Sequence, residues 1–255
     1  MTAITDVPRP ISAKQAAWLQ LAPGLASLPV FAVLAWWLAQ RQIPNIFALV
    51  LSILFVEVPL CWYIMIRHTR KETGQFSLKA TLPWLNAVPL WQYVIIGVPL
   101  VLFSMFMIVG VGPRFDAILQ PGLFGWVPDW FVMHPDPAMF IELPRALVMT
   151  LWVLMFFGLV IAGGITQEVY SRGFLLPRTQ HMGRWAPAYN ALLFAMLHTA
   201  APWAWPGFFL MTLPWSYLVW WRRSVKIGLF IHVGMLALQW LGMTLVIFGF
   251  VEMPG

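Results

Sequence analysis

The chain has 255 residues, of which 61% are hydrophobic and 9% are charged, and its formal net charge is +6. Its mean hydropathy is +0.79. This small number of polar side chains cannot cover the surface of a water-soluble globule of this length. The composition therefore excludes an ordinary soluble domain and indicates a membrane protein. Inside a bilayer every backbone N–H and C=O needs an internal partner, which leaves helices or a closed barrel. The apolar runs are continuous and do not alternate, so they predict helices.

In chain order, apolar runs predict transmembrane helices near residues 16–40, 46–66, 91–112, 146–172, 187–200, 204–221 and 227–250. Two amphipathic stretches rich in Pro and Trp, Phe76–Trp91 and Phe115–Pro144, are expected at the membrane interface, and the first could add a further helix. The predicted fold is therefore an all-α polytopic membrane protein of about seven to eight transmembrane helices. Linkers, repeats and a cleaved signal peptide are not evident, so we expect residues 1–255 to form a single integral membrane domain.

The positive charges predict an orientation. If the first span begins inside, the outer segments hold only Arg41, Arg114 and Arg145 of the fifteen Lys and Arg residues. The inner segments hold the other twelve, which are Arg9, Lys14, Arg67, Arg70, Lys71, Lys79, Arg172, Arg178, Arg184, Arg222, Arg223 and Lys226. This split follows the positive-inside rule and predicts a cytoplasmic N-terminus, in what we expect to be the inner (plasma) membrane of a bacterium. Contact with anionic lipid accounts for the net charge, so we expect membrane lipid and no nucleic acid as a partner.

A small set of ionisable residues lies in the apolar spans, where such groups are costly and therefore indicate function. Glu168 and Arg172 are four residues apart on one helix, which places them on one face in the favoured order, with Gln167 about a hundred degrees around the axis. His198 and His232 lie on later spans at a similar depth. We expect these groups to line a water-filled pocket that is open to the cytoplasm. Taken singly, each also fits a helix-end anchor or a hydrogen-bonded packing residue.

Other polar residues in the spans favour structural roles. Phe194, four residues before His198, can buttress its imidazole. Glu57 lies two residues before Pro59, and we expect a local hydrogen bond near the proline kink rather than a proton relay. We expect Cys61 to be a small buried apolar group and Asn190 to cap or bridge helices.

Further polar residues are expected at the membrane surfaces. His68 and His181 fall in charged inner segments and His134 in an outer one, so we expect all three to be solvated. Glu142 and Arg145 are expected to pair at the outer interface.

The motifs resemble those of the CPBP family, the CAAX proteases and bacteriocin-processing proteins. Residues 167–172, Gln-Glu-Val-Tyr-Ser-Arg, resemble the family's first motif, Glu-Glu-x-x-x-Arg. Residues 194–198, Phe-Ala-Met-Leu-His, resemble the second motif, Phe-x-x-x-His, and His232 stands where the histidine of the third motif is expected. The resemblance covers residues 146–245, which would be the core that carries the motifs.

This resemblance implies an intramembrane endopeptidase with a cytosol-facing cavity. Its substrate would be a peptide or protein, such as a prenylated or leader peptide. In the family, the first glutamate and the second-motif histidine activate a water, and the third-motif histidine with a nearby asparagine stabilises the oxyanion. The candidate catalytic residues are thus Gln167, Glu168, Arg172, His198 and His232. No cofactor is expected; two histidines and an acid could bind zinc, but a glutamate-based mechanism is preferred.

The chain departs from the family pattern at two positions. Gln167 stands where the first glutamate is expected, and an amide can position a water but cannot deprotonate it. Leu236 stands four residues after His232, where the asparagine is expected, and cannot donate a hydrogen bond. Gln239 is on the same face of that helix and could reach inward. Glu168 could replace the missing base, but pairing with Arg172 would make it a weaker one.

Several functions remain open at this point. The chain could cut peptides by an altered arrangement, could be a natural pseudoprotease that binds substrates or partners without cutting, or could be an engineered inactive glutamine variant. A small-molecule or ion transporter would use Glu57, Glu168 and the histidines as relay groups, although the repeats common in such folds are not evident. A structural membrane partner, such as a chaperone or a bacteriocin-immunity component, is a further possibility.

Overall fold

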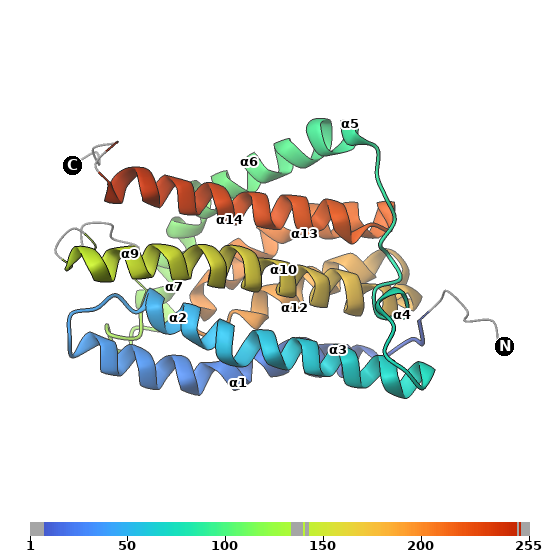
Figure 1. Cartoon of the computed structure of the whole chain (residues 1–255), viewed down its shortest axis with the longest axis horizontal. Helices are drawn as coiled ribbons and strands as arrows, with labels where there is room; N and C mark the ends of the chain where they lie inside the picture. Colours follow the sequence, from blue (N-terminus) through green and yellow to red (C-terminus); the bar gives the residue numbers. More distant parts are fainter. Residues whose placement is uncertain (1–7, 134–139, 141–142, 249, 251–255) are drawn as a thin grey trace.

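The computed structural model describes residues 8–133, 140, 143–248 and 250. These residues form a bundle whose main helices run side by side along its long axis (Figure 1). The described residues contain no β-strand, and one isolated bridge joins Leu85 to Ser224. The predicted all-α fold is therefore confirmed.

Four long helices form the first part of the bundle, and all but the first contain π-helical segments. The bounds are α1 Ala13–Ala39; α2 Ile46–Ser52, η1 Ile53–Glu57 and α3 Val58–Thr73; α5 Leu90–Gln92, η2 Tyr93–Gly97, α6 Val98–Phe106, η3 Met107–Val111 and α7 Gly112–Leu123; α9 Arg145–Leu154, η4 Met155–Gly163, α10 Gly164–Glu168, η5 Val169–Leu175 and α11 Leu176–Arg178. Three single helices follow, which are α12 Ala186–Leu197, α13 Trp205–Arg222 and α14 Val225–Ile247. The short elements are α4 Leu78–Thr81, η6 Gln180–Trp185 and η7 Pro202–Ala204.

Five helices in the described part of the chain are long and apolar enough to cross a membrane. They are Ala13–Ala39, Ile46–Thr73, Leu90–Leu123, Arg145–Arg178 and Val225–Ile247. The predicted spans 187–200 and 204–221 correspond to α12 and α13. With 12 residues, α12 is about 18 Å long and is shorter than the roughly 30 Å core of a bilayer. The polytopic membrane architecture is confirmed, with α12 as a buried partial helix.

The segment Phe76–Trp91 does not form an additional spanning helix. It contains the four-residue α4, after which the chain crosses one end of the bundle and enters α5 at Leu90 (Figure 1). Val225 donates its backbone N–H to the Trp84 carbonyl at 2.8 Å, and the Ser224 hydroxyl donates to the Asn86 carbonyl at 2.6 Å. This strap therefore holds the turn between α13 and α14. In the other stretch, Phe115–Pro144, the third long helix continues as far as Leu123.

Four of the π-helical segments have a common cause in proline. Each is followed, after one residue, by a proline, which has no N–H and whose ring crowds the preceding turn. The residue before each proline instead donates its N–H to the carbonyl five residues back, so the turn widens. The prolines are Pro59, Pro99, Pro113 and Pro177. The last of these segments, η5, carries Arg172, so the first motif runs from α10 into a locally widened turn.

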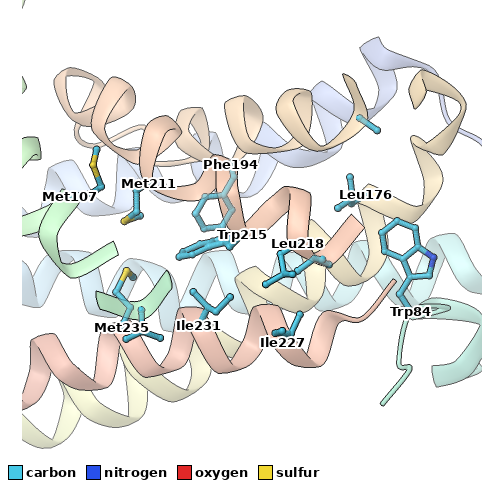
Figure 2. Packing of buried hydrophobic residues seen from close by; sticks show 13 residues of the cluster. Trp84, Met107, Leu176, Phe194, Met211, Trp215, Leu218, Ile227, Ile231 and Met235 are labelled. Carbon is cyan, nitrogen blue, oxygen red and sulfur yellow. The ribbon is translucent and has the colours of Figure 1, made fainter. Parts of the chain in front are cut away.

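The largest apolar core lies between α12, α13 and α14. Figure 2 shows the Phe194 and Trp215 rings next to each other, with Ile231 and Met235 of α14 nearby. The ring centroids of Phe194 and Trp215 are 6.4 Å apart, and both side chains are almost completely buried. This core is the apolar wall of the polar site described below.

The structure tests several of the expectations about single residues. Cys61 is buried and Asn190 bridges helices, since its Nδ2 donates to the Ser171 carbonyl at 2.9 Å, so both predictions are confirmed. His181 is exposed as expected. His134 and Glu142 lie outside the described residues, and so does the expected pairing of Glu142 with Arg145.

The prediction that His68 is solvated is wrong. Its Nε2 lies 3.3 Å from Glu72, and Glu72 also accepts a 2.8 Å hydrogen bond from the buried Arg178 guanidinium. Arg178 donates further to the carbonyls of Phe174 and Thr81, so this cluster joins α3, α4 and the end of the fourth helix. The sequence places His68 in a charged segment, but only the packing of that segment against Arg178 makes it half-buried.

Close packing between α1 and α12 predicts an effect of Gly24→Ala. A β-carbon at Gly24 would collide with the carbonyl oxygen of Leu197, so we expect the substitution to destabilise the fold by about 1–3 kcal/mol and to lower the melting temperature in detergent. Gly242→Ala is the control, because Gly242 on α14 has open space around its β-carbon position and should keep the parental melting temperature. Equal melting of the two variants would contradict the close contact.

Candidate active site

Glu168 and Arg172 form a fully buried ion pair. Arg172 Nη1 donates to Glu168 Oε2 at 2.6 Å, and neither side chain has exposed surface. The two residues are four apart across the junction of α10 and η5, as the sequence predicts. Burying two charges costs several kcal/mol each, so such a pair persists only where its partners satisfy it.

Three other residues surround the Arg172 guanidinium. Its Nε donates to the Ser216 hydroxyl at 3.0 Å, and its Cζ lies 4.4 Å from the centre of the Phe194 ring and 4.8 Å from that of Trp215. Cation–π contacts of this kind are strongest where water is excluded. Arg172 is therefore held by α12 and α13 as well as by its own helix. Ser216 and Trp215 belong to no motif, so the sequence carries no signal for either contact.

His232 approaches the same carboxylate from α14. Its Nδ1 is 3.5 Å from Glu168 Oε2, without the geometry of a hydrogen bond, and its ring packs against those of Phe194 and Trp215. Gly228, one turn earlier on α14, leaves room for the carboxylate, because a β-carbon there would collide with Glu168 Oε1. Glu168 thus lies between a cation on its own helix and an imidazole on another.

His198 lies just after α12 ends. Its Nδ1 is 3.0 Å from the Phe194 carbonyl, and its ring contacts those of Phe194 at 5.2 Å and Phe208 at 4.4 Å between centroids. The expected buttressing by Phe194 is confirmed. Within the described part of the chain, its Nε2 has no hydrogen-bond partner. Phe194 contacts Arg172, His198 and His232 and so connects the three motif regions.

Gln167 faces a different helix from Glu168. Its Nε2 donates to Glu57 Oε1 at 2.7 Å, across 110 positions of sequence, and both side chains are buried. The prediction of a local hydrogen bond for Glu57 near Pro59 is therefore wrong. The reason is the position of α10, which packs against α3 on one side and α14 on the other (Figure 1). Two successive residues of the first motif thus enter two polar clusters, Gln167 with Glu57 and Glu168 with Arg172 and His232.

Leu236 lies in an apolar environment. It packs close to Gly164 of α10 and lines a cavity of about 580 Å³ that extends along α14 to Val246. Gln239 also lines this cavity, as does Asn45 at its far end, and most of the other lining residues are apolar. The cavity therefore begins one helical turn from His232 and leads away along α14.

The described residues do not match a zinc site. None of them form a group of three or more His, Cys, Asp or Glu side chains that could hold a metal ion. A catalytic zinc usually has three protein ligands, whereas Glu168 and His232 supply two, and the Glu168 carboxylate already binds Arg172.

Comparison with known families agrees with the motif resemblance. Residues 149–238 match the family model of Type II CAAX prenyl endopeptidase Rce1-like proteins, about a third of the chain. This segment includes all five candidate catalytic residues, so the resemblance to the CAAX proteases is confirmed. Comparisons with curated proteins and with solved structures found no match.

The buried ion pair predicts an asymmetric response to substitution. Arg172→Met would leave the Glu168 carboxylate buried without its cation, and we expect a loss of about 3–5 kcal/mol in stability. The double variant Arg172→Met/Glu168→Gln removes both charges and should recover much of that loss. Thermal unfolding in detergent measures both. A double variant that is less stable than Arg172→Met alone would contradict the pairing.

Proposed function

We propose that this chain is a CAAX-type intramembrane endopeptidase that hydrolyses a peptide bond in a peptide or protein substrate. The observation that carries the proposal is the position of the Glu168 carboxylate, which contacts Arg172 of its own helix and His232 of α14 inside an apolar core. A buried charge that is costly for stability and is shared with an imidazole is typical of a reactive site. The Rce1-like match of residues 149–238 supports the same class of reaction.

In this proposal each motif residue has its own role. His232 donates a hydrogen bond to the oxyanion that develops on the substrate carbonyl, and the Glu168–Arg172 pair positions its ring. His198 binds the attacking water through Nε2, because its Nδ1 is occupied by the Phe194 carbonyl. Gln167 orients the same water through its amide. Prenylated peptides and leader peptides are the substrates to test.

A second candidate function is binding without cleavage. Gln167 has no basic group, and Leu236 packs against α10 where the family has an asparagine that would help to bind the oxyanion. A pseudoprotease with this site would bind the same substrates and release them intact. Binding of a peptide by the parent protein, with no cleavage by it or by Gln167→Glu, would favour this function over the first.

The proposed activity predicts a histidine-dependent cleavage. In detergent, the parent should cut a farnesylated CAAX peptide or a leader peptide, whereas His198→Ala and His232→Ala should each lose about 100-fold or more in kcat, the usual range for removing a general acid–base group or an oxyanion donor. His181→Ala is the matched control, since His181 is exposed and belongs to none of the three motifs. Equal loss in the control, or none in the two site variants, would argue against the proposed site.

We also propose that the chain lies in the inner membrane of a bacterium with its N-terminus in the cytoplasm. The charge distribution supports this orientation, because Arg70 and Lys71 end α3 near the strap and Arg222 ends α13 there. In a Cys61→Ala background, a cysteine at exposed Arg41 should react with a membrane-impermeant maleimide in intact cells, and one at exposed Gln75 only after permeabilisation. The reverse pattern would overturn the orientation.

A further inference from the structure

We infer that Glu57 supplies the carboxylate that position 167 lacks and acts as the base that activates the attacking water. This inference rests on the proposed function. Its starting point is the hydrogen bond between Gln167 Nε2 and Glu57 Oε1 at 2.7 Å, which places a carboxylate from another helix next to the first position of the first motif. The site therefore holds both a carboxylate and an amide, but the carboxylate is at position 57 and the amide is at position 167.

The surroundings of Glu57 support a chemical role over a purely structural one. Glu57 is 5% exposed and Gln167 is 6% exposed, so the pair is buried. Within the described residues, the second carboxylate oxygen, Glu57 Oε2, has no hydrogen-bond partner, and neither has Gln167 Oε1. Neither atom is among the fully enclosed polar atoms without a partner, in contrast to Glu168 Oε1 and Arg172 Nη2. Both atoms can therefore still bind a water.

A third polar side chain lies at the same level of the bundle. Gln20 of α1 is completely buried, and both atoms of its amide have no partner. The preceding residue, Leu19, accepts a hydrogen bond from the Tyr170 hydroxyl, one turn after Gln167. The helix α1 also packs against both η1, which ends at Glu57, and α12, which ends before His198. Among the described residues, Gln20 thus adds a buried amide without a partner to this part of the bundle, but its atoms are fully enclosed and leave the water site to Glu57 and Gln167.

The proposed step is balanced within the protein and the substrate. Glu57 Oε2 takes one proton from the water that Gln167 and His198 hold, and the hydroxide forms a bond to the carbonyl carbon of the scissile peptide. The tetrahedral intermediate then breaks its C–N bond, and the leaving nitrogen takes the proton from Glu57. One water is consumed, and the carboxylate returns to its first state.

The exchange of amide and carboxylate can be tested directly. We expect Glu57→Gln to lose 100-fold or more in kcat on the peptide that the parent cuts, with little change in melting temperature, because the two side chains have the same shape. The double variant Glu57→Gln/Gln167→Glu moves the carboxylate to position 167 and keeps the pair, so we expect activity within about tenfold of the parent. Cys61→Ala, one turn further along the same helix, is the packing control and should stay within about twofold.

The outcomes separate this inference from the proposed function. If Glu57→Gln cuts within threefold of the parent, or if Glu57→Gln and the double variant are both inactive although folded, Glu57 is not the base and the inference fails. If the parent is inactive while Gln167→Glu or the double variant cuts, the inference fails and the protease site stands. If the parent, Gln167→Glu and the double variant all fail to cut, the proposed function fails, and the inference fails with it.

Discussion

The buried pairing of Glu168 with Arg172 is the constraint on which the rest of the site depends. Neither side chain reaches solvent, so each charge needs partners inside the bundle. Arg172 takes Ser216 from α13 and the Phe194 ring from α12, and Glu168 receives His232 from α14. One ion pair thus fixes α12, α13 and α14 around the fourth long helix. The apolar core between these helices therefore has a defined arrangement.

Proline shapes the helices that surround this pair. Four widened turns precede Pro59, Pro99, Pro113 and Pro177, and two of them lie at the site. The first ends at Glu57 and the last contains Arg172. π-helical turns are frequent at functional sites because the extra residue redirects side chains on one face. In this chain they accompany the two polar clusters on either side of α10.

The division of the first motif between two clusters gives a physical account of its unusual residue. A glutamate at position 167 would bring a second carboxylate within 3 Å of Glu57, and two like charges at that distance inside a bundle repel strongly. Glutamine instead donates to Glu57. The replacement at 167 and the acid at 57 are therefore compatible with each other, whereas either residue considered alone is unexplained.

The sequence by itself determined the membrane class, the helical fold and the motif residues, because hydropathy and spacing along one helix are local properties. The i,i+4 pair of Glu168 with Arg172 and the contact of Phe194 with His198 follow from helical geometry alone. Only the tertiary structure decided that Glu57 meets Gln167, that Ser216 binds Arg172 and that His68 is half-buried beside Glu72. Each of these contacts joins residues on helices whose relative rotation depends on packing throughout the bundle, and no periodicity in a single segment records that rotation.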